Sequence, residues 1–161
     1  MRKYLAIIGS VLAMASAGFA QASATLTVSG TVAPINTITI ASQSGYNALD
    51  LVNGATGKLV GIATETSNDK LGYKVTLASA NAGATAQAVL KGTGGNTDFV
   101  NYSILYNGTA VTLAAGSATV TSATARTVAA GVTKNIAVTF AGGWLAADTY
   151  SDTLTLTIAG N

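Results

Sequence analysis

The stretch YSILYNGTAVTL, residues 102–113, places a turn signal between two runs that are rich in apolar and β-branched residues. Asn107 and Gly108 can adopt the positive φ angles that a two-residue hairpin turn requires. Such a turn joins two neighbouring antiparallel strands. The stretch therefore predicts a β-hairpin, and we take it as the starting point for the fold.

Apolar residues recur at every second position in much of the remaining chain, which is typical of strands with one buried face. The alternating sets are Ile38 and Ile40; Val60 and Ile62; Tyr73, Val75 and Leu77; Ile136, Val138 and Phe140; and Tyr150, Leu154, Leu156 and Ile158, the last taken as one strand. Residues 113–133 are poor in large apolar side chains, so we expect only weak edge strands there, anchored by Val120 and Val128.

Many short strands separated by Gly, Asn and Ser turns predict an all-β protein built as an antiparallel β-sandwich. The sequences GATGK, residues 54–58, and KGTGGN, residues 91–96, lack phosphate-binding and dinucleotide-binding spacing, so we expect a turn and a Gly-rich loop. An eight-stranded outer-membrane barrel is the alternative. It is disfavoured because aromatic residues make up only 6% of the chain, too few for two interfacial girdles.

The first residues have the order of a secretory signal peptide, because Arg2 and Lys3 precede an apolar run and small residues follow it. Ala20-Gln21-Ala22 fits the cleavage site, with a cut after Ala20 as the alternative. A retained membrane anchor is the other interpretation, but the apolar run is short. We therefore expect a signal peptide at residues 1–22, an extension at 23–34 and a sandwich domain at 35–161.

The charge of the predicted mature chain is balanced. Two of the eight Lys and Arg residues lie in the leader, so six remain against six Asp and Glu. No basic surface is left that would indicate nucleic-acid binding. Charged residues make up only 9% of the sequence, which suits a surface covered by neighbouring subunits.

The residue types needed for most catalytic sites are missing. The chain has no His and no Cys, which removes Ser-His-Asp and Cys-His nucleophiles and ordinary zinc sites. The six carboxylates are Glu65, Asp50, Asp69, Asp98, Asp148 and Asp152, and we expect the aspartates to satisfy local backbone groups in turns. We predict no catalytic residue, no metal and no cofactor. Trp144 is expected to pack over a sheet end, with a sugar-stacking platform as the alternative.

The stretch TLTVSGTVAPI, residues 25–35, precedes the predicted sandwich and has its own apolar face. Leu26, Val28 and Val32 share that face, and Gly30 completes the row. Pro34, the only proline, fixes its own φ angle and favours extended geometry in the residue before it. A strand attached through such a joint can fold back onto its own domain or add to a sheet edge of another molecule.

This stretch resembles the N-terminal extension of chaperone-usher fimbrial subunits. Two further segments, TETSNDKLGYKVTLASAN at residues 64–81 and LAADTYSDTLTLTI at residues 145–158, are similar to parts of the cysteine-free alpha-class fimbrial subunits and of the spore coat protein U family. The three blocks cover about a third of the expected mature chain. Many spore coat U-like domains and most other fimbrial subunits carry a disulfide after the extension, whereas this chain has none and is therefore more similar to the alpha class.

The resemblance implies an immunoglobulin-like sandwich that lacks its final strand. A periplasmic chaperone, and then the extension of the next identical subunit, would fill the gap, with an outer-membrane usher exporting the polymer to the cell surface as a fimbria for adhesion or biofilm. By position, the donor strand would present Leu26, Val28, Gly30 and Val32. The groove wall and chaperone-pairing residues would be Tyr150, Leu154, Leu156 and Ile158, with Asn161 as the chaperone anchor. A receptor is not identified.

Two other interpretations remain at the level of sequence. In the first, the protein is a self-complemented secreted β-sandwich, a coat, matrix or adhesin protein in which residues 26–32 complete their own sheet. In the second, the protein is an enzyme, which would need a pair of carboxylates that the sequence does not bring together.

Overall fold

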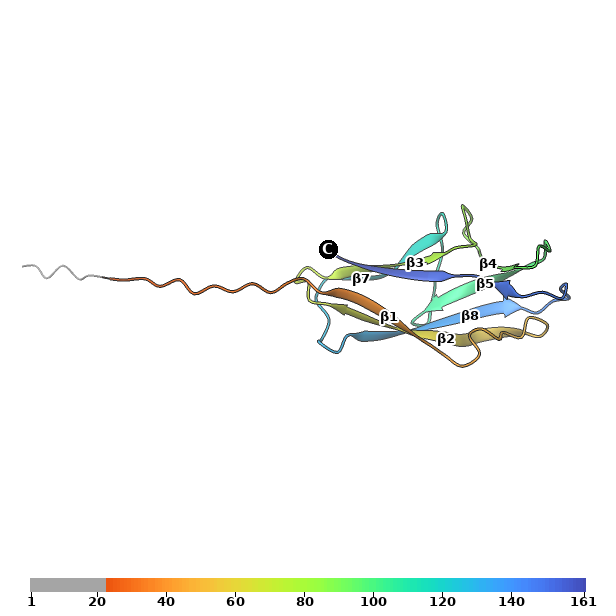
Figure 1. The fold of residues 1–161 in the computed structure, drawn as a ribbon, viewed down its shortest axis with the longest axis horizontal. Coiled ribbons are helices and arrows are strands. Elements are labelled where there is room, and N and C mark those ends of the chain that lie inside the picture. The colour runs from red at the N-terminus through yellow and green to blue at the C-terminus, as the bar shows by residue number, and fades with distance from the viewer. Residues whose placement is uncertain (1–22) are drawn as a thin grey trace, which may run out of the picture. The chain divides into compact units, whose positions relative to one another are not determined.

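The computed structural model describes residues 23–161 and folds residues 33–161 into two antiparallel β-sheets packed face to face (Figure 1). The predicted β-sandwich is thus confirmed. The predicted signal peptide at residues 1–22 lies outside the described residues. Residues 23–161 contain no helix with the length and apolar character that a bilayer span requires.

The larger sheet has the strand order β1-β2-β8-β5-β4-β9, and β6 pairs with β5 beside this path. Its strands are β1 (Asn36–Ser42), β2 (Gly54–Ser67), β8 (Val132–Ala141), β5 (Phe99–Tyr106), β4 (Ala88–Gly92), β9 (Tyr150–Ser151) and β6 (Thr109–Ala110). The smaller sheet has the order β10-β3-β7, formed by β10 (Leu154–Gly160), β3 (Tyr73–Ser79) and β7 (Ser117–Ala123).

The alternation in the sequence places the core between the sheets. Val75 and Leu77 of β3 have no exposed surface, while Lys74 between β3's inward-facing residues is exposed. On the facing sheet, every second residue is buried along β5 and from Ile136 onward in β8, as in Ile104 and Ile136. Burying large aliphatic side chains contributes about 1.5 to 3 kcal/mol each, so these rows fix which face of every strand points inward.

The hairpin predicted for residues 102–113 is confirmed. Tyr106 pairs with Thr109 across a two-residue turn between β5 and β6. Asn107 has a φ angle of 49° and Gly108 one of 81°, so both residues are in the left-handed region. This region is open to Gly and tolerated by Asn, which explains why this dipeptide marks the turn.

The GATGK segment differs from the predicted turn, because residues 54–58 form the first part of β2. The pairing with β8 shifts register between Ala55 and Lys58, and Gly57 has a φ angle of 61°. The Gly57 amide donates to Thr139 Oγ1 at 2.9 Å. The glycine therefore makes a bulge within a strand and not a chain reversal.

Three other expectations need correction. The strand β4 was not predicted at all, because its sequence AVLKG is short and shows little polar alternation. Val128 anchors no strand and lies exposed in the connection between β7 and β8, although Val120 does lie on the edge strand β7. The single strand expected for residues 150–158 is two strands, because β9 pairs with β4 and β10 pairs with β3.

We call the two ends of the sandwich proximal and distal. The proximal end is where β1 begins, and it includes Ile35 and the connections at residues 68–72 and 124–131. The distal end carries the connections at residues 43–53, 93–98 and 142–149. In Figure 1 the proximal end lies on the left of the sandwich and the distal end on the right.

Candidate functional site

Among residues 23–161, two strand edges have no pairing partner, and they border the same side of the sandwich. β1 ends the order of the larger sheet and pairs only with β2, and β10 ends the order of the smaller sheet and pairs only with β3. Cα atoms of β1 and β10 come within 8 Å of each other, yet the strands form no ladder. Each edge therefore presents backbone N–H and C=O groups that another strand could pair with.

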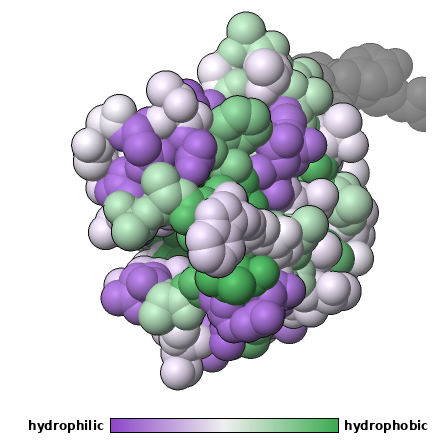
Figure 2. Space-filling view, turned by 90° about the vertical axis from the view of Figure 1, so that its right-hand side faces the viewer, coloured by the Kyte–Doolittle hydropathy of each residue, from purple (hydrophilic) through white to green (hydrophobic). Residues whose placement is uncertain are grey.

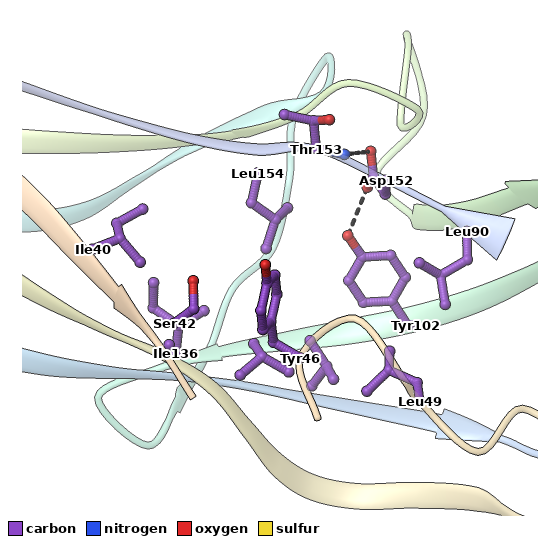
Figure 3. Close-up of a pocket in the computed structure, with 13 residues that line it drawn as sticks. Ile40, Ser42, Tyr46, Leu49, Leu90, Tyr102, Ile136, Asp152, Thr153 and Leu154 are labelled. Atoms are coloured by element: carbon purple, nitrogen blue, oxygen red, sulfur yellow. Dashed lines mark hydrogen bonds between the residues drawn. The ribbon is translucent and has the colours of Figure 1, made fainter. Parts of the chain in front are cut away.

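An apolar groove opens between these edges. It has a volume of about 380 Å³ and takes its lining from both sheets and from the connection after β1. Ile40 and Leu154 lie on its two sides (Figure 3), and Leu90, Ile136 and Val138 of the buried core also line it. The groove is thus a place where the core of the sandwich opens toward solvent.

The wall formed by β10 has the alternation that an inward-facing strand requires. Leu154, Leu156 and Ile158 are half-buried, whereas Thr155 and Thr157 between them are exposed. On β1, Ile38 is half-buried and Ile40 keeps 47% of its surface exposed. The apolar side chains of both edge strands therefore remain only partly covered along the opening.

Asp152 fixes the start of β10 at the distal end of the groove. Its carboxylate accepts hydrogen bonds from the Tyr102 hydroxyl at 2.6 Å, the Ser79 hydroxyl at 2.6 Å and the Asn81 amide at 3.0 Å. Figure 3 shows the bond from Tyr102. Tyr102 belongs to β5 and Ser79 to β3, so the carboxylate joins the two sheets. The carboxylate also accepts from the neighbouring Thr153 amide at 2.7 Å, as expected of an aspartate in a turn, but its other contacts reach distant strands.

The Tyr102 hydroxyl is held in its neutral form. Burial raises its pKa above the usual range, and the hydrogen bond to Asp152 and the charge of that carboxylate act in the same direction. A tyrosine with a raised pKa remains a hydrogen-bond donor. The contact is therefore a structural anchor of the groove and has no features of an acid or base catalyst.

The residues predicted as the donor face lie in a segment without regular structure. Leu26, Val28 and Val32 are 89%, 86% and 84% exposed, and Gly30 has no neighbouring atom where a Cβ would lie. The predicted groove residues Leu154, Leu156 and Ile158 do lie together on β10. Tyr150, which was predicted to lie with them, is not on β10.

Tyr150 lies on β9 in the other sheet, where its hydroxyl donates to the carbonyl oxygen of Ala146 at 2.9 Å. It lines a second hollow next to the groove. Asn161 lies beyond the proximal end of β10, and its side-chain amide donates to the carbonyl oxygens of Leu71 and Ala123 at 3.1 and 2.8 Å. These contacts hold the end of β10 against β3 and β7.

Asn68 fixes the joint at Pro34, a role that the sequence did not indicate. Its side-chain amide donates to the carbonyl oxygen of Ala33 at 2.8 Å, and its side-chain oxygen accepts from the Ile35 amide at 2.7 Å. The backbone groups on both sides of Pro34 are therefore already bonded to the sandwich. A tight reversal of the chain at this joint would have to break both bonds.

Glu65 was the sole glutamate considered as an acid or base. It has no exposed surface, and its carboxylate accepts hydrogen bonds from Tyr73, Tyr106 and Thr121 at 2.8, 2.6 and 2.7 Å. Both carboxylate oxygens are therefore occupied inside the core. Such a group contributes to structure and cannot reach a substrate.

Trp144 contradicts the expectation that it packs over a sheet end. Its side chain is 99% exposed, on the connection between β8 and β9.

No protein-family model and no curated protein matches this chain.

Proposed function

We propose that this protein is the structural subunit of a cell-surface fimbria, in which the extension of each molecule fills the groove of the next. The observation that carries the proposal is the open apolar groove between the unpaired edges of β1 and β10. A strand that pairs with two partners needs them about 9 to 10 Å apart. β1 and β10, whose Cα atoms come within 8 Å of each other, would therefore move apart to let an inserted strand pair with both edges and cover the exposed floor. Main-chain hydrogen bonds and apolar burial would then stabilise the same contact.

The extension matches the two edge strands of the groove in length. β1 and β10 are each seven residues long, and residues 26–32 span the same number of positions. Side chains at every second position of a strand point to one face, so Leu26, Val28 and Val32 would enter the groove together. Gly30 would leave room at one point of the row.

Exchange between molecules is favoured over closure within one molecule. Asn68 already holds the joint at Pro34 on both sides. Self-complementation would require the chain to reverse at this joint. Export through the periplasm, a chaperone that covers the groove before assembly, and an outer-membrane usher follow from the resemblance to fimbrial subunits and are part of the proposal.

The test replaces one donor residue and uses its neighbour as a control. Val28→Asp should leave a folded, secreted monomer, because a carboxylate cannot be buried in an apolar groove without a partner. Thr27→Asp should still polymerise, because residue 27 would point out of the groove. Size-exclusion chromatography and electron microscopy of both variants measure the outcome. Polymers of Val28→Asp as abundant as those of the wild type would refute the donor role.

A wild-type protein that stays monomeric would instead favour the self-complemented sandwich. In that case a structure of the monomer should place residues 26–32 in the groove of the same chain. The two outcomes are separated by the mass of the purified wild-type protein alone.

A further inference from the structure

The large apolar side chains that stay exposed in residues 23–161 are concentrated in four places. They are Leu26, Val28 and Val32 in the extension; Ile40 and Tyr46 at the groove; Ile35, Leu71 and Val128 at the proximal end; and Val52, Phe99 and Trp144 at the distal end. Strand exchange accounts for the first two places. It leaves the apolar residues of the two ends without a role, and exposed apolar groups that cluster mark interaction surfaces.

The distal end presents its tryptophan on a fixed loop. The Gly143 amide donates to the carbonyl oxygen of Leu51 at 3.0 Å, and the Ala146 amide donates to the carboxylate of Asp98 at 2.8 Å. Trp144 lies between these two anchors. Figure 2 looks onto this end and shows apolar surface through its middle with hydrophilic residues at its border.

The proximal end is hollowed. A depression of about 690 Å³ lies between Ile35, the end of β2 and the connection before β8. Ile35 and Val128 give it apolar walls, and Arg126 adds a guanidinium group. An indole ring can bury its faces against aliphatic side chains and stack on a guanidinium, so this hollow has the chemistry that receives a tryptophan.

The path of the chain determines which ends meet in a fibre. The extension enters β1 at the proximal end, so the molecule that accepts it lies beyond that end. The molecule that donates a strand to this groove must then lie beyond the distal end, because two neighbours at one end would overlap. The proximal end of each molecule therefore faces the distal end of another.

The charges of the two ends are complementary. The distal end carries three carboxylates and two cations: Asp50, Asp98, Asp148, Lys91 and Lys58, whose Nζ lies beside Gly45. The proximal end carries three exposed cations and one carboxylate: Lys70, Lys74, Arg126 and Asp69. Opposite potentials favour a contact between unlike ends and disfavour one between like ends.

We infer that the distal end of one subunit docks onto the proximal end of the next, with Trp144 seated in the hollow beside Val128 and Arg126. The contact is heterologous and does not close on itself, which is the symmetry that a filament needs. This inference rests on the proposed function. It adds a second contact between subunits that does not involve the exchanged strand.

The sole tryptophan of the chain reports on this contact directly. In the Val28→Asp monomer the indole should emit as a solvent-exposed group and be quenched freely by acrylamide. In wild-type polymers its emission should shift to the blue, and the acrylamide quenching constant should fall severalfold. Polymers whose tryptophan stays as accessible as in the monomer would overturn the end contact and leave strand exchange intact. Failure of the wild type to polymerise would overturn the proposed function itself.

Cross-linking identifies the surface that covers the indole, because the chain has no native cysteine. Polymers of a Trp144→Cys, Val128→Cys double variant should give a ladder with a short bismaleimide after the subunits are separated in formic acid. The control pairs Trp144→Cys with Ser103→Cys, an exposed position on the outer face of β5, and should give no ladder. Equal ladders from both pairs, or a protected tryptophan without a ladder from the first, would refute the hollow as its seat.

Discussion

Glu65 links the two sheets of a chain that has no disulfide. Its carboxylate joins Tyr106 of the larger sheet to Tyr73 and Thr121 of the smaller one. Three hydroxyl donors therefore occupy the two oxygens of this buried carboxylate. Removing one member of such a cluster leaves buried polar groups unpaired at about 1 to 3 kcal/mol each. This hydrogen-bonded cluster therefore holds the two sheets together near the proximal end.

The same cluster predicts how stability depends on alkaline pH. Burial raises the pKa of Tyr73 to about 12, with the Glu65 hydrogen bond and charge adding to the effect. An unfolded tyrosine loses its proton near pH 10, so the folded state binds more protons between about pH 10 and 12. Stability should be complete below that window and fall as pH rises through it. Urea unfolding at about pH 8 and about pH 11 measures the loss.

Tyr73→Phe supplies the comparison for this measurement, in the Val28→Asp background so that assembly does not interfere. The substitution removes the ionisable hydroxyl, so the variant should lose less free energy of unfolding between the two pH values. Tyr106 has a raised pKa for the same reasons and will keep part of the dependence. An unchanged pH dependence in Tyr73→Phe would show that this hydroxyl does not contribute.

At the scale of elements, Asp152 lies where the chain passes from β9 in the larger sheet to β10 in the smaller one, and its hydrogen bonds hold this crossing in place. Asp152→Ala would remove the acceptor of three donors from Tyr102, Ser79 and Asn81. We expect a loss of about 2 to 4 kcal/mol in the free energy of unfolding and a weakened distal wall of the groove. Asp50→Ala is the control, because Asp50 caps an exposed turn, and it should cost clearly less. Chemical denaturation of both variants measures the difference.

The elements that could be predicted from sequence are those with long alternating rows. β3, β8 and the β5–β6 hairpin follow from Leu77, Val138 and the Asn107 turn because local pattern and burial agree there. β4 and the sheet change before Leu154 could not be predicted, because they depend on pairings between distant segments. The same limit hid the long-range hydrogen bonds of the groove.

The apolar residues that line the candidate site could be predicted from the sequence, but the hydrogen bonds that hold its parts in place could not. Leu154, Leu156 and Ile158 share a face by simple alternation, and the structure keeps them together. Asn68 at the joint lies more than thirty positions from the groups it binds, so no local signal marks it. Trp144 was misjudged because a solitary aromatic beside glycines is compatible with a packed or an exposed loop.

At the scale of the whole molecule, the open groove limits the stability of the sandwich, because part of its apolar core is in contact with water. The floor of the groove reaches Leu90, Ile136 and Val138, which belong to the main apolar cluster. Covering this floor removes apolar surface from water at about 25 cal/mol per Å². Strand insertion should therefore stabilise the entire domain, because small single domains unfold cooperatively.

A peptide of residues 24–33 tests this coupling in the Val28→Asp protein, whose own extension cannot insert. The empty groove should bind a hydrophobic dye, and the peptide should abolish dye binding and raise the melting temperature. At about one hundred times its dissociation constant, the peptide should add about 2.7 kcal/mol to the free energy of unfolding. A peptide carrying Thr27→Asp should act like the natural sequence, whereas one carrying Val28→Asp should have no effect. Equal stabilisation by all three peptides would mean that binding does not use the apolar face, and the groove would lose its assignment as the acceptor.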